Sequence, residues 1–351
     1  MRNVYCVCMR PTYDLGGMIR PMVTNLDTHI ARRLEEVPDP LGVRASTAWI
    51  LGRANFVHLD PAGITRTAAL VRAKIQNKNL LTQTQFGSRQ IGPQLVFLQD
   101  VVNFCFWAPK GKPRWEVEYP VGIRQNGWYA LAAVFERALA EGIPILDTAF
   151  LARLTREDTR HIFRGAGETP IPLLAKRQQF LKSGGEILSQ TCLGSVDRFI
   201  DSVGRDAAKL ARSIVTNFPS FEDSVTIDGR RITFYKRAQI CVYDLSLLPR
   251  QRIQNLSALT AFADYKLPQL LRRLGAIHYT KPLERRVDSM KLIPQGSREE
   301  VEIRAATIWA AELVAQNLGI PAVVVDNALW LHATTTPQSA KPYHRTLTTC
   351  Y

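Results

Sequence analysis

Short motifs that mark the commonest nucleotide-binding and hydrolytic sites are missing from this sequence. Its 351 residues contain no GxxxxGKS/T phosphate loop, no GxGxxG fingerprint, no GxSxG nucleophile elbow and no HExxH zinc motif. These absences remove P-loop ATPases, Rossmann dehydrogenases, elbow-type serine hydrolases and zincins as leading hypotheses. The function must be carried by clusters of side chains instead.

Cysteine and histidine are scarce, and neither is spaced to hold a metal ion or a framework of disulfide bonds. The six cysteines are scattered, with Cys6 and Cys8 as the only close pair, and the six histidines include no HxxxH pair. We therefore expect reduced thiols, a cytoplasmic location, no metal ion and no other cofactor.

Long apolar runs are absent as well. No stretch approaches the roughly 18 apolar residues of a spanning helix, so we expect no membrane partner. The segment before Met18 lacks the apolar core of a secretory signal, and Met18 and Met22 are further candidate initiators. We expect residues 1–22 to be an N-terminal extension outside the domain, and residues 23–351 to be a single domain.

Positive charge, in contrast, is abundant. The sequence has 45 Lys and Arg residues against 31 Asp and Glu, a formal net charge of +14. Such a charge favours an anionic partner, which includes nucleotides, nucleic acids and acidic membranes. The basic residues form no block of like charge, so a solvated basic surface is the simpler explanation. The 46% hydrophobic content allows a large core.

Apolar residues recur mainly at helical spacing, which predicts a mostly α-helical chain. Helical character is expected over Val23–Ala73 (with Asp60 as an N-cap), Trp128–Ala140, Leu173–Leu188, Val196–Phe218 and Val301–Leu318, with capping boxes at Thr155 and Ser297. A short strand is expected over Trp115–Tyr119. The Asp228-Gly229 turn predicts a hairpin over Val225–Phe234. We predict two minor strand pairs at most, in one α-rich domain of two interleaved helical lobes, and expect a monomer.

The segment from Asp100 to Trp107 is a first candidate for a binding surface. It places Asn103 among the aromatic residues Phe104, Phe106 and Trp107. Core packing is the simpler interpretation of such a run. The alternative is one wall of a base pocket, in which a ring stacks on the base and a polar side chain reads its edge.

A second candidate is Tyr235-Lys236-Arg237, which follows the predicted hairpin. Two adjacent cations after a hairpin fit a solvated turn. Their aromatic neighbours favour partial burial, and a buried lysine and arginine need an anion such as phosphate.

Two acidic residues complete the candidates. Asp264 lies in an apolar context, and either a helix cap or a carboxylate that stabilises an oxocarbenium-like sugar explains it. Asp326 follows the apolar run Val323–Val325, where capping is the simpler interpretation.

Longer strings then allow a comparison with known families. The strings DVVNFCFW, NGWYALAAVFERALAEGIPI, FYKRAQICVYD, LTAFADYKLPQLLRRLGAI, REEVEIRAATIWAAE and VVDNALW occur in this order. Together they closely resemble the queuosine salvage protein family of queuosine 5′-phosphate N-glycosylase/hydrolases, from about Ala45 to Trp330. The resemblance implies release of queuine, a 7-deazaguanine base, from queuosine 5′-phosphate for reinsertion into tRNA. It also implies a helical fold like that of helix-hairpin-helix DNA glycosylases, with a small β-hairpin element.

The resemblance assigns roles to residues of this chain. Asp264 in the FADY string is implied to be the catalytic carboxylate. Lys236 is implied at the phosphate or ribose, and Asp326 at the base. The remaining substrate-binding candidates are Phe104, Trp107, Asn103, Tyr235, Arg237, Tyr265 and His58. The surroundings of His58 and of His344 match the family pattern only loosely.

Two other functions stay open at this point. A DNA or RNA glycosylase that acts on a polymer would suit the net charge, and its binding would weaken steeply with salt. A non-catalytic RNA-binding protein would use the aromatic residues for stacking and Asp264 only as a cap. For the salvage enzyme we expect no stable complex with nucleic acid.

Overall fold

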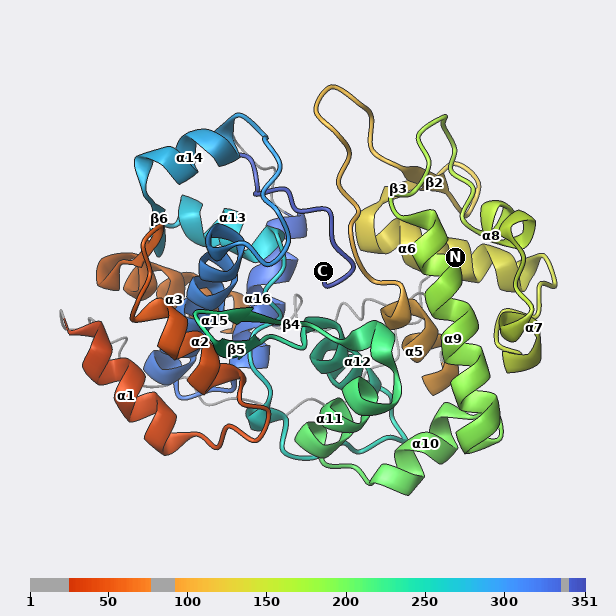
Figure 1. The fold of residues 1–351 in the computed structure, drawn as a ribbon, viewed down its shortest axis with the longest axis horizontal. Helices are drawn as coiled ribbons and strands as arrows, with labels where there is room; N and C mark the ends of the chain where they lie inside the picture. The colour runs from red at the N-terminus through yellow and green to blue at the C-terminus, as the bar shows by residue number, and fades with distance from the viewer. Residues whose placement is uncertain (1–24, 77–91, 336–340) are drawn as a thin grey trace. The chain divides into compact units, whose positions relative to one another are not determined.

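The computed structural model describes residues 25–76, 92–335 and 341–351 (Figure 1). The predicted extension 1–22 and most of the polar segment 74–92 lie outside these ranges. The described chain forms two compact units whose segments alternate along the sequence. Unit 1 comprises residues 25–76, 223–239, 254–335 and 341–347, and unit 2 comprises residues 92–222, 240–253 and 348–351.

Unit 1 is mainly helical and carries two small antiparallel sheets. Its elements are α1 (Leu26–Glu36), α2 (Val43–Leu51), β1 (Val57–Leu59), α3 (Pro61–Gln76), β4 (Ser224–Ile227), β5 (Arg230–Thr233), η2 (Leu256–Ala258), α13 (Lys266–Arg273), β6 (Ile277–Tyr279), α14 (Lys281–Asp288), α15 (Arg298–Leu318) and α16 (Ala322–Thr335). The strands pair as β1 with β6 and as β4 with β5.

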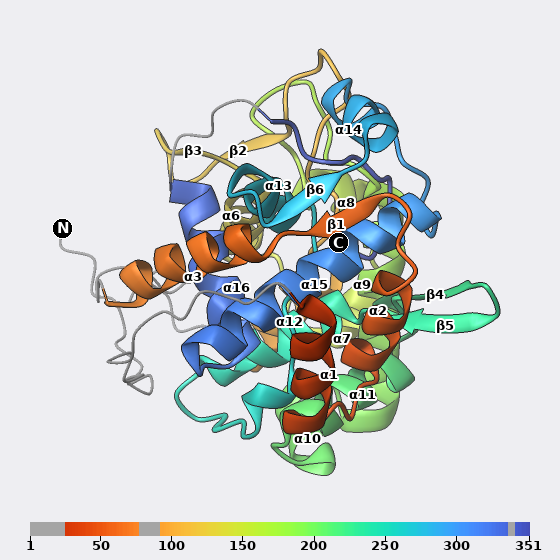
Figure 2. The same ribbon diagram turned by 90° about the vertical axis from the view of Figure 1, so that its left-hand side faces the viewer.

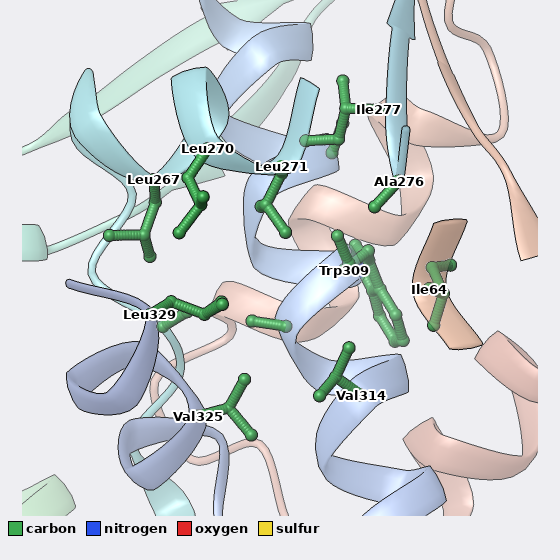
Figure 3. Close-up of a cluster of buried hydrophobic side chains, with 14 of the residues drawn as sticks. Ile64, Leu267, Leu270, Leu271, Ala276, Ile277, Trp309, Val314, Val325 and Leu329 are labelled. Carbon is green, nitrogen blue, oxygen red and sulfur yellow. The ribbon is translucent and has the colours of Figure 1, made fainter. Parts of the chain in front are cut away.

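Helix α15 forms the centre of unit 1. It packs against α1, α2, α3, α13 and α16 and against both strands of the β1–β6 sheet, and its residues from Glu300 to Ala315 are buried. Figure 3 shows Trp309 in the middle of this core, with Ile64 on one side and Val325 and Leu329 on the other. The Trp309 indole N–H donates to Thr47 Oγ1 at 3.2 Å, so the buried ring keeps its hydrogen bond.

No single helix in the described ranges is long and apolar enough to cross a membrane. By length and composition alone, α15 and α16 would pass that test together, although they meet at a bend of 111°.

The β1–β6 sheet joins distant parts of the sequence beside α15 (Figure 2). Beside this sheet, the backbone of α3 at Gly63 closely approaches the backbone at Gly275. A Cβ on Gly63 would lie 1.9 Å from the Gly275 carbonyl oxygen. Only glycine allows this contact. At the start of α3, the Gly63 N–H donates to Asp60 Oδ2 at 2.8 Å, which confirms the predicted cap.

Unit 2 is built around the long helix α9 (Leu174–Cys192), which packs against α5 (Pro93–Val101), α7 (Thr148–Ala152), α8 (Arg156–Ile162) and α10 (Val196–Val203). Its other elements are β2 (Glu116–Glu118), β3 (Arg124–Asn126), α6 (Gly127–Ala140), α11 (Ala207–Asn217) and η1 (Pro219–Phe221). Helix α12 (Lys236–Ser246) begins in the unit 1 sequence and continues into that of unit 2.

Several sequence predictions are confirmed. The described chain is mostly helical, α6 begins one residue before its predicted start, and β4 and β5 form the hairpin around Asp228-Gly229. The capping box at Thr155 forms with Asp158. At Ser297 one half of the predicted box is shown, in which the Ser297 side chain accepts from the Glu300 N–H.

Two predictions are wrong. The described chain contains three strand pairs rather than two at most, and the region predicted as helical before Ala73 includes β1. The segment Val196–Phe218 is helical as predicted, and it is divided into α10 and α11 because Gly204 ends α10 with a φ of 91°. The strands of the missed pair have only three residues each, which is too short for a periodic pattern.

Candidate active site

Three ionisable side chains singled out from the sequence lie in unit 1, on three separate segments. Lys236 is the first residue of α12, Asp264 lies two residues before α13, and Asp326 lies inside α16. The charge of Lys236 acts on both carboxyl groups, and the charge of Asp264 acts on Asp326. The fold therefore brings together one cation and two acids that are far apart in the sequence.

Asp264 is held by the first turn of the helix that follows it. Its Oδ1 atom accepts the Lys266 N–H at 2.7 Å and the Leu267 N–H at 2.9 Å. Within the described ranges, Oδ2 accepts no hydrogen bond from the protein, and the residue is only partly buried. The cap and the carboxylate interpretations are thus compatible, because one oxygen holds the helix and the other is available to a ligand.

Burial raises the pKa of Asp264 above its ordinary value of 3.8. The positive charge of Lys236 and the two backbone N–H donors oppose this rise, because they stabilise the ionised form. Asp264 is therefore a carboxylate with restricted hydration, beside a cation. Such a group stabilises a positive charge that develops nearby, or it orients and deprotonates water.

Asp326 is more deeply buried than Asp264. Its Oδ1 atom accepts the Phe262 N–H at 2.7 Å, which connects α16 to the segment that carries Asp264. Burial, together with the negative charge of Asp264, raises the pKa of Asp326 to about 7. The negative charge of Asp264 therefore favours the protonated form of Asp326, which is populated near neutral pH. The capping role expected for Asp326 is wrong, because the residue lies in the interior of α16.

Lys236 follows a backbone reversal. Tyr235 has a φ of 50°, in the left-handed region, and α12 starts at the next residue. The Lys236 N–H donates to Asp223 Oδ2 at 2.9 Å, and the lysine itself is buried. A solvated turn is therefore the wrong interpretation of this segment, whereas the predicted burial of Lys236 and Arg237 is confirmed.

A side-chain amide joins the two strings that carry Lys236 and Asp264. Gln239 Oε1 accepts the Thr260 N–H at 2.8 Å, and Gln239 Nε2 donates to Thr260 Oγ1 at 3.1 Å. Gln239 Nε2 also donates to the Phe234 carbonyl oxygen at 2.8 Å. All three groups are buried, so these bonds fix the start of α12 against the segment before Asp264.

The other predicted residues of unit 1 occupy different environments. Arg237 is buried, and Tyr265 packs on Tyr343 with ring centroids 4.9 Å apart. His58 is exposed on β1 opposite His278, and within the described ranges its side chain makes no hydrogen bond with Lys236, Asp264 or Asp326. His344 is buried, and burial together with the charge of Arg304 lowers its pKa to about 3, so its imidazole is neutral near pH 7.

The candidates of unit 2 lie just after α5. Asn103 Nδ2 donates to Asp100 Oδ1 at 3.0 Å. The Phe104 ring is fully buried against Phe180, and the Arg177 guanidinium lies 4.3 Å from its centroid. Arg177 also donates to the carbonyl oxygens of Val102, Phe104 and Cys105. Trp107 is buried too. These contacts make the segment rigid, and its role in a base pocket stays a prediction.

Two functional candidates were missed in the sequence. Asp223 and Arg304 contact the Lys236 and Asp264 segments, but neither lies in a pattern of its own. Arg304 lies within the REEVEIRAATIWAAE string, as a basic residue among apolar ones that the structure shows to be buried. Among the residues that the structure describes, no group of three or more His, Cys, Asp or Glu side chains can hold a metal ion.

Comparison with known proteins adds an independent finding. The model of a family described as "Queuosine salvage protein" matches residues 88–351. The chain is 39% identical to the queuosine 5′-phosphate N-glycosylase/hydrolase of Sphaerobacter thermophilus, over 89% of this chain and 98% of that protein. It is 35% identical to the protein of the same name from Mus musculus, over 88% of this chain and 98% of that protein. The Bos taurus protein of that name is 32% identical, over 86% of this chain and 96% of that protein.

The raised pKa of Asp326 predicts a pH-dependent effect on stability. In the folded protein this group binds a proton more tightly than in the unfolded chain, so its stabilising contribution is complete below about pH 4 and is lost as the pH rises toward 7. Asp326→Asn cannot ionise, and its amide oxygen can still accept the Phe262 N–H. We expect its Tm to match wild type near pH 4 and to exceed it by about 2 °C or more at pH 8.

Thermal unfolding followed by circular dichroism at both pH values measures this difference. Asp27→Asn, which changes an exposed carboxylate of the same unit, is the control and should show no growth of the Tm difference with pH. An Asp326→Asn difference that is equal at both pH values would contradict the assignment.

Proposed function

Because the chain belongs to the queuosine salvage protein family, we propose that it hydrolyses the N-glycosidic bond of queuosine 5′-phosphate and releases queuine. It is an N-glycosyl hydrolase. The named activity of its relatives supports this function. The observation that carries it is the grouping of Lys236 with Asp264 and Asp326. The phosphate of the substrate needs a cation, and the positive charge that develops on the ribosyl group needs a carboxylate.

Asp264 is the carboxylate that acts at the sugar. In hydrolysis the bond between C1′ and the base nitrogen breaks, and its electron pair leaves with the base, which takes up a proton. Water forms the new bond to C1′ and loses a proton. A 7-deaza base lacks the ring nitrogen whose protonation helps ordinary purines leave, so stabilising the ribosyl cation matters more. In its ionised form Asp264 suits this task, because Oδ1 accepts the two N–H groups of the helix cap and Oδ2 accepts neither of them.

Asp326 has the chemistry to hold the base. With a pKa of about 7 it carries a proton for part of the time at neutral pH, so it can donate a hydrogen bond to the departing base or to its cyclopentenediol arm. Its Oδ1 is already occupied by the Phe262 N–H, which leaves Oδ2 for the ligand.

Lys236 is the group for the phosphate or the ribose. Its buried position beside two carboxyl groups makes it the compensating charge of the site. The remaining substrate-binding candidates stay part of this proposal. They are Phe104 and Trp107 for the base pocket, Asn103 for an edge of the base, and Tyr235, Arg237, Tyr265 and His58 without a more specific role.

The wider expectations are proposals as well. The likeness of the fold to helix-hairpin-helix DNA glycosylases was implied by the sequence resemblance, and the predominance of helices in both units is compatible with it. For an enzyme that acts on a mononucleotide, we further propose a cytoplasmic location, a monomeric state and no stable complex with nucleic acid.

Incubation with queuosine 5′-phosphate tests the function directly. We expect free queuine and ribose 5-phosphate in equal amounts by mass spectrometry. Guanosine 5′-phosphate is the control substrate and should stay intact. Failure to release queuine from the nucleotide, with base release from a polymer instead, would contradict the proposal.

Replacement of Lys236 tests its role at the phosphate. Lys236→Ala should lower kcat/KM for queuosine 5′-phosphate at least about 10-fold more than for the nucleoside queuosine, because only the nucleotide loses a charge-assisted contact. Lys281→Ala, at an exposed lysine of α14, is the control. An unchanged ratio between the two substrates would exclude the phosphate role.

A further inference from the structure

Asp223 closes the backbone reversal that precedes Lys236. Its carbonyl oxygen accepts the Phe234 N–H at 2.9 Å and the Tyr235 N–H at 3.3 Å, and its Oδ2 accepts the Lys236 N–H at 2.9 Å. One residue therefore takes up three consecutive backbone donors. These bonds hold the backbone of Tyr235 in the left-handed conformation, which residues other than glycine adopt rarely.

Arg304 fixes the carboxylate of Asp223 from α15. Its Nη1 donates to Asp223 Oδ1 at 2.8 Å and its Nη2 donates to Asp223 Oδ2 at 2.7 Å, while the guanidinium lies 3.8 Å from the centroid of the Phe234 ring. Both side chains of the ion pair are only 3% exposed. A bidentate pair of this kind sets orientation as well as charge.

The same guanidinium reaches the segment of Asp264. Its third donor, Nε, is bonded to the Ala263 carbonyl oxygen at 3.3 Å, directly before Asp264 in the chain. The planar fork of Arg304 thus joins two points, the residue before Asp264 and the carboxylate that holds Lys236. A lysine at this position would keep the charge but has no planar fork with which to make all three bonds.

A second Arg–Asp pair of the same unit, between the buried Arg272 and the exposed Asp288, shows how specific this arrangement is. Arg272 donates to both oxygens of Asp288, at 2.7 and 3.1 Å, and also to Glu284. It has the same fork geometry, but it makes no hydrogen bond to Ala263 or Asp223 and only ties α13 to α14.

We propose that Arg304 and Asp223 are positioning residues that set the distance and orientation between Asp264 and Lys236. The inference rests on the proposed function and adds to it a pair that acts through the segments of Asp264 and Lys236. Loss of the fork lets the two segments shift, and a shift of about 1 Å at reacting groups costs on the order of 100-fold in rate.

Steady-state kinetics of Arg304→Lys on queuosine 5′-phosphate test the inference. We expect kcat to fall at least about 10-fold while KM changes less than about 3-fold, in protein shown to be folded by circular dichroism well below its Tm. A residue that only stabilised the fold would leave the kcat of the folded enzyme unchanged. Arg272→Lys is the matched control, since it loses a bidentate pair in the same unit and should keep wild-type kcat.

Asp223→Asn supplies a second variant and a double-mutant cycle. The amide keeps an acceptor for the Lys236 N–H but loses the charge that pairs with Arg304. We expect it to reduce kcat to a similar extent, and we expect the double variant to be no worse than either single variant, because the two residues act as one unit. If Arg304→Lys does not fold, the kcat of Asp223→Asn decides the question.

The outcomes separate this inference from the function on which it rests. If wild-type protein releases no queuine, the proposed function fails. If wild type is active and both variants have kcat values equal to the Arg272→Lys control, or if their effects on kcat simply multiply, the positioning role is overturned while the function stands.

Discussion

The constraint on which unit 1 depends is the burial of charged side chains along α15. Sixteen consecutive residues of this helix are buried, and Glu302, Arg304 and Glu312 are among them. A buried charge without partners is unstable, so each must bind another segment. Glu302 accepts the N–H groups of residues 55 and 56, Glu312 pairs with Arg44 at 2.9 Å, and Arg304 pairs with Asp223. The helix thus fixes three segments by electrostatics, and the segment that carries Asp223 binds the start of α12 at Lys236.

Hydrogen bonds to the backbone also hold the two acidic residues Asp264 and Asp326 close together. Asp264 and Asp326 lie close enough that the charge of one raises the pKa of the other, and both are poorly hydrated. Each carboxyl group of such a pair disfavours the ionised form of the other, so their closeness depends on backbone segments that are held in place. The Phe262 N–H fixes Asp326, and the N–H groups of the α13 first turn fix Asp264. The negative charge of Asp264 thus favours the protonated form of Asp326, which is compatible with the different roles proposed for the two groups.

The sequence predicted the helical class, the β4–β5 hairpin and the three ionisable groups, because long periodic runs, an Asp-Gly turn and acids in apolar contexts are local signals. It could not predict the β1–β6 pair, whose three-residue strands meet across most of the chain. Asp326 was assigned to a cap because position in the sequence does not reveal that its partner is the Phe262 backbone. Arg304 and Asp223 were missed for the same reason, because the hydrogen bonds by which Arg304 links Asp223 to Ala263 form only once the chain has folded.

Replacement of the carboxylate at position 264 by its amide tests the central claim most directly. In Asp264→Asn the amide oxygen can still accept the Lys266 and Leu267 N–H groups, so the helix start and the fold are kept. The measurement is the Kd for queuosine 5′-phosphate by calorimetry together with single-turnover release of queuine. We expect a Kd within a few-fold of wild type and a rate lower by at least about 1,000-fold, because only the transition state loses its charge partner. Wild-type turnover in the folded variant would contradict the assignment of Asp264.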